Sequence, residues 1–167
     1  MDVNFNLKIG TLYKRIDYGF CTMDVPNEWN GRYFVDNDGN EQQNLIFIFN
    51  SKETTGDTIP LNSFTIQYSD LAPSEEMTPQ LCLEIEEGVN PGGQKQQIPC
   101  DNLNDIPAIA IQTKNYVANQ TNCNILCTYV KNSNSPRMYR FCYSCEIDKE
   151  KNYKSTFEHM LKSIKIK

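Results

Sequence analysis

The alternation of hydrophobic and polar residues along this chain of 167 residues predicts a protein built mainly of β-strands. Side chains on a strand point to opposite faces in turn, so a period of two indicates a strand with one buried face. Residues 8–25 are expected to form a strand, a turn and a strand, in which Cys21, Met23 and Val25 occupy the apolar positions of the alternation. A continuous apolar run at 45–49 predicts a strand covered on both faces. Further strands are expected at 63–68 and 106–112, and residues 123–147 are expected to form a long hairpin.

A first helix is predicted to begin at Thr78 and Pro79. Threonine can cap the free backbone N–H groups, and proline at the first helical position loses no hydrogen bond. Gly88 predicts the end of this helix. Its apolar side is expected to carry Leu81, Cys82, Ile85 and Val89, and its solvent-exposed side Glu84, Glu86 and Glu87.

A second helix is predicted near the end of the chain, with Asn152 as its cap. Its apolar stripe follows helical spacing and contains Tyr153, Phe157, Met160, Leu161 and Ile164. Residues 164–167 are expected to turn into a short last strand.

The segments between these elements are expected to be turns and loops. Residues 36–40 resemble a calcium loop at three positions, but the glycine is misplaced and Phe47 stands where a bidentate glutamate is needed, so a hairpin turn is predicted. Residues 51–60 and 90–97 are predicted to be loops. Trp29, the sole tryptophan, is expected to anchor the core, with an aromatic contact to a partner as the alternative.

Composition limits the function more than it defines it. The chain is 39% hydrophobic and 22% charged, which is typical of a globular protein, and its length predicts one domain over residues 1–167. A net charge of −5 argues against a nucleic-acid partner, which attracts basic proteins, and against docking on an anionic membrane. We expect no transmembrane segment, because no apolar run approaches the length that spans a bilayer.

The compartment is predicted from the seven cysteines and from the first residues. An odd count leaves at least one thiol unpaired, which favours a reducing, cytoplasmic location. The first residues also lack the basic start and apolar centre of a signal peptide. The alternative is an extracytoplasmic or lipoprotein domain whose targeting segment has been removed.

Four cysteines lie in the predicted hairpin, namely Cys123, Cys127, Cys142 and Cys145. Their spacing fits a zinc site, but Cys142 and Cys145 point to opposite faces of a strand, so at most three of the four can meet. A redox pair at Cys142 and Cys145 is disfavoured because such pairs begin a helix. A cross-strand disulfide is an alternative in an oxidising compartment. The leading interpretation is that all four are small, buried, apolar side chains.

His159 is the sole histidine and is expected to be exposed on the second helix. Hydrolase mechanisms that use serine or cysteine therefore lack an obvious base. No catalytic residue and no cofactor is predicted.

Several segments resemble the Mog1/PsbP-like superfamily, which includes PsbP, Mog1 and bacterial domains of the DcrB type. Gly19, Phe20, Pro26 and Trp29 fit its opening motif, and residues 157–165 resemble its usual ending, F-x-x-M-L-x-S-I-K. The strands at 45–49 and 106–108 and the helix near Thr78 also resemble it, so the likeness spans residues 11–167. The resemblance implies an α+β fold, an α/β/α sandwich with a central, mostly antiparallel sheet.

The resemblance also implies a non-enzymatic function, because its members mainly bind proteins, scaffold complexes or act as adaptors. The first hypothesis is therefore a protein-binding module with an acidic or aromatic exposed patch. The alternative is a thiol or metal-binding protein that uses the hairpin at 123–145. The sequence identifies neither the partner nor the oligomeric state.

Overall fold

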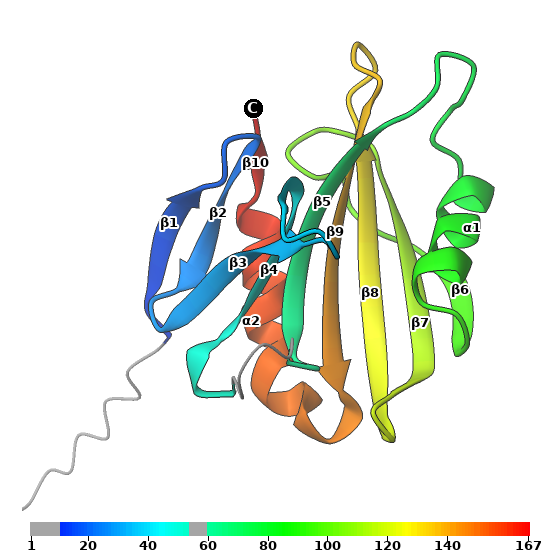
Figure 1. Cartoon of the computed structure of the whole chain (residues 1–167). Helices are drawn as coiled ribbons and strands as arrows, with labels where there is room; N and C mark the ends of the chain where they lie inside the picture. The colour runs from blue at the N-terminus through cyan, green and yellow to red at the C-terminus, as the bar shows by residue number, and fades with distance from the viewer. Residues whose placement is uncertain (1–10, 54–59) are drawn as a thin grey trace, which may run out of the picture.

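The computed structural model of the protein describes residues 11–53 and 60–167 (Figure 1). Residues 8–10 of the first predicted strand and most of the predicted loop at 51–60 lie outside these ranges. The strands are β1 (Tyr13–Asp17), β2 (Cys21–Pro26), β3 (Trp29–Val35), β4 (Glu41–Asn50), β5 (Ser63–Asp70), β6 (Gln94–Ile98), β7 (Ala108–Ala118), β8 (Thr121–Lys131), β9 (Arg137–Glu146) and β10 (Lys165–Ile166). The helices are α1 (Pro79–Val89) and α2 (Glu150–Ser163).

The strands form two sheets, and every pairing between them in the described ranges is antiparallel. The large sheet has seven strands in the order β3-β4-β5-β9-β8-β7-β6, and the small sheet has three in the order β1-β2-β10. Helix α1 packs on β6 and β7, whereas α2 packs on β2 and β9 at the other face of the large sheet (Figure 1). The predicted α+β sandwich with a mostly antiparallel central sheet is confirmed.

The larger core lies between the large sheet, the small sheet and α2. At its centre Phe157 is fully buried and packs against Tyr143, Trp29 and Phe64, with ring centroids 5.0, 5.6 and 6.3 Å away. Trp29 is buried, which confirms its predicted role as a core anchor. The apolar stripe of α2 also lies where it was predicted.

A second, smaller core lies beneath α1 on the opposite face of the large sheet. As predicted, Thr78 caps this helix: its hydroxyl accepts a hydrogen bond from the Leu81 N–H at 3.2 Å, and Pro79 follows it. The helix continues through Gly88 to Val89, one residue past the predicted end.

Three sequence-based expectations about local structure were wrong. Residues 94–98 form the edge strand β6 instead of a loop, because they pair with β7 along five residues. Helix α2 begins at Glu150, after a 3-10 turn at Ile147–Lys149, so Asn152 lies inside it and does not cap it. Glu86 is fully buried rather than solvent-exposed.

The strand at 45–49 is also only partly as predicted. Ile46, Ile48 and Phe49 are buried, whereas Leu45 and Phe47 are half-buried. The reason is that α1 packs on β6 and β7 and leaves this half of the sheet uncovered (Figure 1). The turn at 36–40 and the short last strand β10 are confirmed.

Candidate functional site

A cleft of about 540 Å³ opens where the turn between β1 and β2 approaches the neighbouring strands of the large sheet. Five aromatic rings line it, and Arg137 and Lys167 stand at its walls. We call it the aromatic cleft. Its rings belong to Tyr18, Phe20, Tyr33, Tyr68 and Tyr139.

Strand register brings the rings of the aromatic cleft together. Tyr68 of β5 and Tyr139 of β9 are direct cross-strand partners. Phe20, from the turn before β2, packs edge-on against Tyr68 at 4.7 Å and lies 6.0 Å from Tyr139. The Arg137 guanidinium lies 4.0 Å from the centre of the Tyr68 ring, a distance typical of a cation–π contact. The cleft therefore has a stiff, aromatic wall.

The hydroxyl of Tyr18 lacks a hydrogen-bond partner within the described part of the chain, although its oxygen is buried. Burial raises the pKa of Tyr18, and the nearby Cys21 and Tyr33 raise it further, so the group stays a neutral phenol. Buried polar groups are normally paired, because an unpaired one costs about 1–3 kcal/mol. A bound molecule with a polar atom at this point would satisfy the hydroxyl.

Charged groups at the cleft occur in opposite pairs. Lys167 contacts Asp17 at 2.5 Å, and Arg137 contacts Asp70 at 3.4 Å. The hydrogen bond from Lys167 holds the pKa of Asp17 below its ordinary range. The paired charges leave the cleft without a strong net field, which favours a neutral, amphipathic ligand.

A second polar cluster lies beneath α1. Glu86 is completely buried, and Arg140 is 7% exposed. The Arg140 Nε and Nη2 atoms donate to the two Glu86 carboxylate oxygens at 2.7 and 3.1 Å. Tyr129 and Asn90 also donate to Glu86. We call Glu86, Arg140 and Tyr129 the buried triad.

Both charges of the buried triad are retained. Burial alone would raise the pKa of Glu86, but the hydrogen bonds and charge of Arg140 outweigh it and hold that pKa below its ordinary value. For Arg140, burial favours the neutral form, but Glu86 raises the guanidinium pKa above its ordinary value. The pair is therefore a buried ion pair.

The four hairpin cysteines divide into a bonded pair and two free thiols. Cys127 and Cys142 are opposite each other on β8 and β9 and form a disulfide. The leading interpretation, four buried thiols, is therefore wrong for this pair. Cys123 and Cys145 are buried free thiols, and burial raises the pKa of Cys145 to about 12.

The structure does not gather the four cysteines around one point. Cys142 belongs to the core under α1 and Cys145 to the core under α2. In the described ranges one group of three metal-ligating side chains has its ligand atoms within 4.8 Å, and it consists of Glu86, Cys127 and Cys142. Two of these atoms are bonded to each other, and Glu86 is occupied by Arg140, so a cation fits this group poorly.

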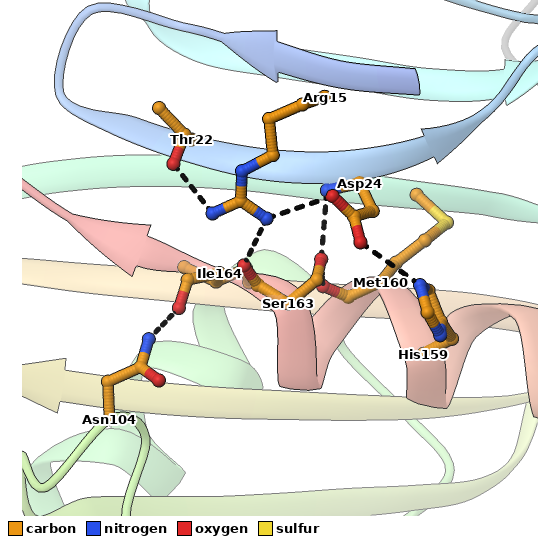
Figure 2. A network of polar contacts seen from close by, with 8 residues as sticks. All are labelled: Arg15, Thr22, Asp24, Asn104, His159, Met160, Ser163 and Ile164. Carbon is orange, nitrogen blue, oxygen red and sulfur yellow. Dashed lines mark hydrogen bonds and ion pairs between the residues drawn. The ribbon is translucent and has the colours of Figure 1, made fainter. Parts of the chain in front are cut away.

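His159 is exposed, as predicted, but it has a carboxylate partner (Figure 2). Its Nε2 lies 3.2 Å from Asp24 Oδ2, and its ring stacks on Tyr13 at 4.0 Å. Ser163 lies one turn along α2, but its hydroxyl donates to the Met160 carbonyl oxygen at 2.7 Å and accepts from the Asp24 N–H at 2.9 Å. The serine is thus committed to the backbone, and the three residues do not form a catalytic relay.

Arg15 makes this cluster a clamp between the small sheet and α2 (Figure 2). It donates to Asp24 at 2.9 Å, to Thr22 at 2.8 Å and to the Ser163 carbonyl oxygen at 2.7 Å. The last bond satisfies a carbonyl at the C-terminus of the helix, where a cation is favourable. The clamp fixes β1 and β2, and with them the turn that forms one wall of the aromatic cleft.

Asp24→Asn is expected to lower the free energy of unfolding at pH 7 by about 1 kcal/mol, because charge-assisted hydrogen bonds to Arg15 and His159 are weakened. The Arg15 hydrogen bond lowers the pKa of Asp24 from its ordinary value of 3.8. A carboxyl whose folded pKa is lowered stabilises the protein above its ordinary pKa and loses this effect as the pH falls through the folded pKa. Urea unfolding measured from pH 7 downward should therefore show that the unfolding free energies of the unsubstituted protein and of Asp24→Asn approach each other below pH 3.8. An equal deficit in the exposed control Asp101→Asn would contradict the assignment.

Neither the aromatic cleft nor the buried triad was predicted from the sequence. The cleft combines residues from β1 and the turn after it, from β3, β4, β5 and β9 of the large sheet, and from the end of the chain at Lys167. The order of the strands in the large sheet does not follow the chain. One signal was available. Tyr139, Phe141 and Tyr143 occupy every second position of a single strand, so their side chains point to one face of the sheet and make it aromatic.

Solved structures of similar fold support the architecture. The chain is similar to cyanobacterial PsbP from Synechocystis sp. PCC 6803, with TM-score 0.65 and 16% identity over 97% of this chain and 96% of that one. It is similar to the Ran-binding protein Mog1p of Saccharomyces cerevisiae, with TM-score 0.57 and 10% identity over 94% and 96%. It is also similar to LpqN of Mycobacterium tuberculosis, described as involved in cell envelope biogenesis, with TM-score 0.53 and 14% identity over 93% and 90%.

Comparisons of sequence add no closer relative. No protein-family model matches the chain, and no curated protein matches it. The structural likeness covers nearly the whole chain and shows a Mog1/PsbP-like fold. No helix in the described ranges is long and apolar enough to cross a membrane.

Proposed function

We propose that this chain, with its Mog1/PsbP-like fold, is a non-enzymatic module that binds a protein partner in the aromatic cleft. The observation that carries the proposal is the composition of the cleft. Tyrosine and arginine are enriched at the residues that contribute most to protein–protein affinity. Here Tyr68, Tyr139 and Arg137 stand together on adjacent strands. The Tyr18 hydroxyl, which has no hydrogen-bond partner among the residues that the structure describes, lines the same cleft.

The chemistry of the cleft indicates the kind of segment that it would hold. Aromatic grooves bind extended, proline-rich segments, whose preformed conformation loses little entropy on binding. The ion pairs at Asp17 and Arg137 already neutralise the local charges. We therefore favour an extended, uncharged segment with a polar group that reaches Tyr18. Mog1p, which shares the fold, is described as Ran-binding, so a protein partner has a precedent within this architecture.

Site-specific photocrosslinking in the cells that make the protein tests the proposal. A photoreactive phenylalanine derivative in place of Gln43, an exposed residue at the cleft, should yield a discrete protein adduct. The same substitution at exposed Asn122, on β8, is the matched control and should not yield that adduct. Arg137→Glu, combined with the probe at Gln43, should reduce the adduct at least tenfold, because it removes the cation over Tyr68.

Two outcomes would overturn the proposal. One is the same set of adducts from both probe positions, which would indicate random collision. The other is that the probe at Gln43, in folded protein, forms an adduct with a small molecule or forms no adduct. Either result would show that the cleft does not bind a protein.

A second candidate function is thiol chemistry on the hairpin at 123–145. One observation favours it, namely the disulfide between Cys127 and Cys142 beside Arg140.

A further inference from the structure

The two sulfurs of the disulfide differ in their access to solvent. Cys127 is 0% exposed and Cys142 is 5% exposed. Cys142 borders a groove of about 330 Å³ on the part of the large sheet that α1 leaves uncovered. Leu45, Phe47 and Val89 give this groove apolar walls, and Gln67 and Ser144 add polar groups.

Strand register sets the direction from which Cys142 can be approached. Phe47, Thr65, Cys142 and Cys127 are successive cross-strand partners on β4, β5, β9 and β8, so they lie in one row. Phe47 and Thr65 line the groove together with Leu45 and Gln67 of the same two strands, so this part of the groove lies on the side of Cys142 that is remote from Cys127. Ile125 of β8 also borders the groove. A nucleophile in the groove therefore approaches the Cys142 sulfur opposite its bond to Cys127, the direction that displacement at sulfur requires.

Arg140 stands beside the sulfur that would leave. Its Nη2 atom lies 3.2 Å from Cys127 Sγ. A neighbouring guanidinium stabilises a thiolate, and a more stable thiolate is a better leaving group. The Glu86 carboxylate, with an oxygen within 4.8 Å of both sulfurs, opposes this effect. Both its oxygens, however, accept hydrogen bonds from Arg140, which offset its charge.

We propose that Cys142 is the site at which a small-molecule thiol exchanges with the disulfide, with Cys127 as the leaving thiolate. In the first step a thiolate RS⁻ attacks Cys142 Sγ. The RS–SCys142 bond forms, the Cys142–Cys127 bond breaks, and the electron pair stays on Cys127, next to Arg140. A second RS⁻ then attacks the sulfur of RS, giving RSSR and a Cys142 thiolate. Two thiols are thus oxidised to one disulfide, and the protein disulfide is reduced to two thiols.

The groove limits the reactant to a small thiol. Its volume is about 330 Å³, and it is bordered by the last residue of α1, Val89, and by Asn90, which follows the helix. The inference rests on the second candidate function and is independent of partner binding at the aromatic cleft, which lies on other residues. Its readout is the identity of the modified cysteine, so either proposal can fail alone.

The test uses the purified full-length chain, oxidised, with glutathione as the probe. After exchange at neutral pH, acid quenching and alkylation, mass spectrometry should find the mixed disulfide on Cys142 and not on Cys127. The variants Cys127→Ser and Cys142→Ser form a matched pair. Each lacks the disulfide and keeps one of its two cysteines as a free thiol: Cys142 in the first and Cys127 in the second. With oxidised glutathione, Cys142 in the first should react at least tenfold faster than Cys127 in the second.

Further comparisons separate native exchange from exchange through unfolding. Exchange should be at least tenfold faster than global unfolding measured by hydrogen exchange. The double variant Glu86→Gln and Arg140→Gln, which carries no net charge change, should slow the first step about tenfold. If that variant does not fold, the serine pair still decides. Any of four results would overturn the inference. These are a glutathione adduct on Cys127, equal reaction rates of the free thiols in the two serine variants, exchange that is no faster than global unfolding, and free Cys127 and Cys142 thiols in the oxidised protein.

Discussion

Arg140→Ala is expected to be among the most destabilising single substitutions in this protein, lowering the free energy of unfolding by about 3–5 kcal/mol. The substitution leaves the Glu86 carboxylate fully buried without its cation. Removing one partner of a buried ion pair costs far more than the pair itself contributes, because the remaining charge has no water to solvate it. Denaturant unfolding under non-reducing conditions measures the loss. The deficit should narrow as the pH falls, because desolvation favours protonated Glu86 in the variant.

A triple variant is the control for Arg140→Ala. Glu86→Leu, Arg140→Met and Tyr129→Phe together replace the buried triad with apolar side chains of similar size. We expect this combination to recover most of the lost stability, since apolar replacements of buried ion pairs are often neutral or stabilising. A loss below about 1 kcal/mol for Arg140→Ala would mean that water reaches Glu86.

Phe157→Ala is expected to cost about 3–5 kcal/mol, the range for an aromatic side chain removed from a packed core. Phe157 is 0% exposed and lies between α2 and the large sheet, stacked on Tyr143 at 5.0 Å and on Tyr153 at 5.8 Å. Its removal leaves a cavity that the surrounding rings, held by β3, β5, β9 and α2, cannot close. Thermal and denaturant unfolding give the value.

Leu161→Ala is the matched control, one turn further along the same helix. Leu161 is only half-buried, so the same kind of truncation should cost clearly less. Similar losses at the two positions would show that helix propensity, rather than the core around Phe157, determines the effect.

The sequence predicts best those elements whose periodicity is strong and local. The hairpin at 123–147 and the apolar stripe of α2 each combine a regular pattern with a clear boundary. The end of the chain also resembles a known motif. Thr78 with Pro79 predicts the start of α1 correctly because a helix cap depends on only a few neighbouring residues.

Glu86 shows why the candidate sites were harder to predict. Its charge suggested a place with Glu84 and Glu87 on the outer side of α1, although it follows Cys82 by four residues and so shares the buried face of the helix. Its burial depends on Arg140, which lies 54 residues along the chain and meets it only through the packing of α1 on the sheet. A buried charge is tolerated when a partner is present, and the sequence does not show that partner.

The disulfide and the aromatic cleft depend on register in the same way. The alternation of side chains along a strand correctly places Cys142 and Cys145 on opposite faces of the sheet. It cannot show which cysteine of β8 lies opposite Cys142. Tyr68 and Tyr139 likewise meet because β5 pairs with β9 rather than with the next strand in the chain.

The pairing of β5 with β9 also has a consequence for how the chain acquires its structure. Strands β7, β8 and β9 are consecutive, so they can assemble as each one is synthesised. Strand β5 is made long before β9, and until β9 arrives one of its edges has no neighbour. Such contacts between distant segments slow folding, because a long loop must close before they form. The half of the sheet that carries β3, β4 and β5 therefore completes late, and its open edge is the point at which a nascent chain is most exposed to aggregation.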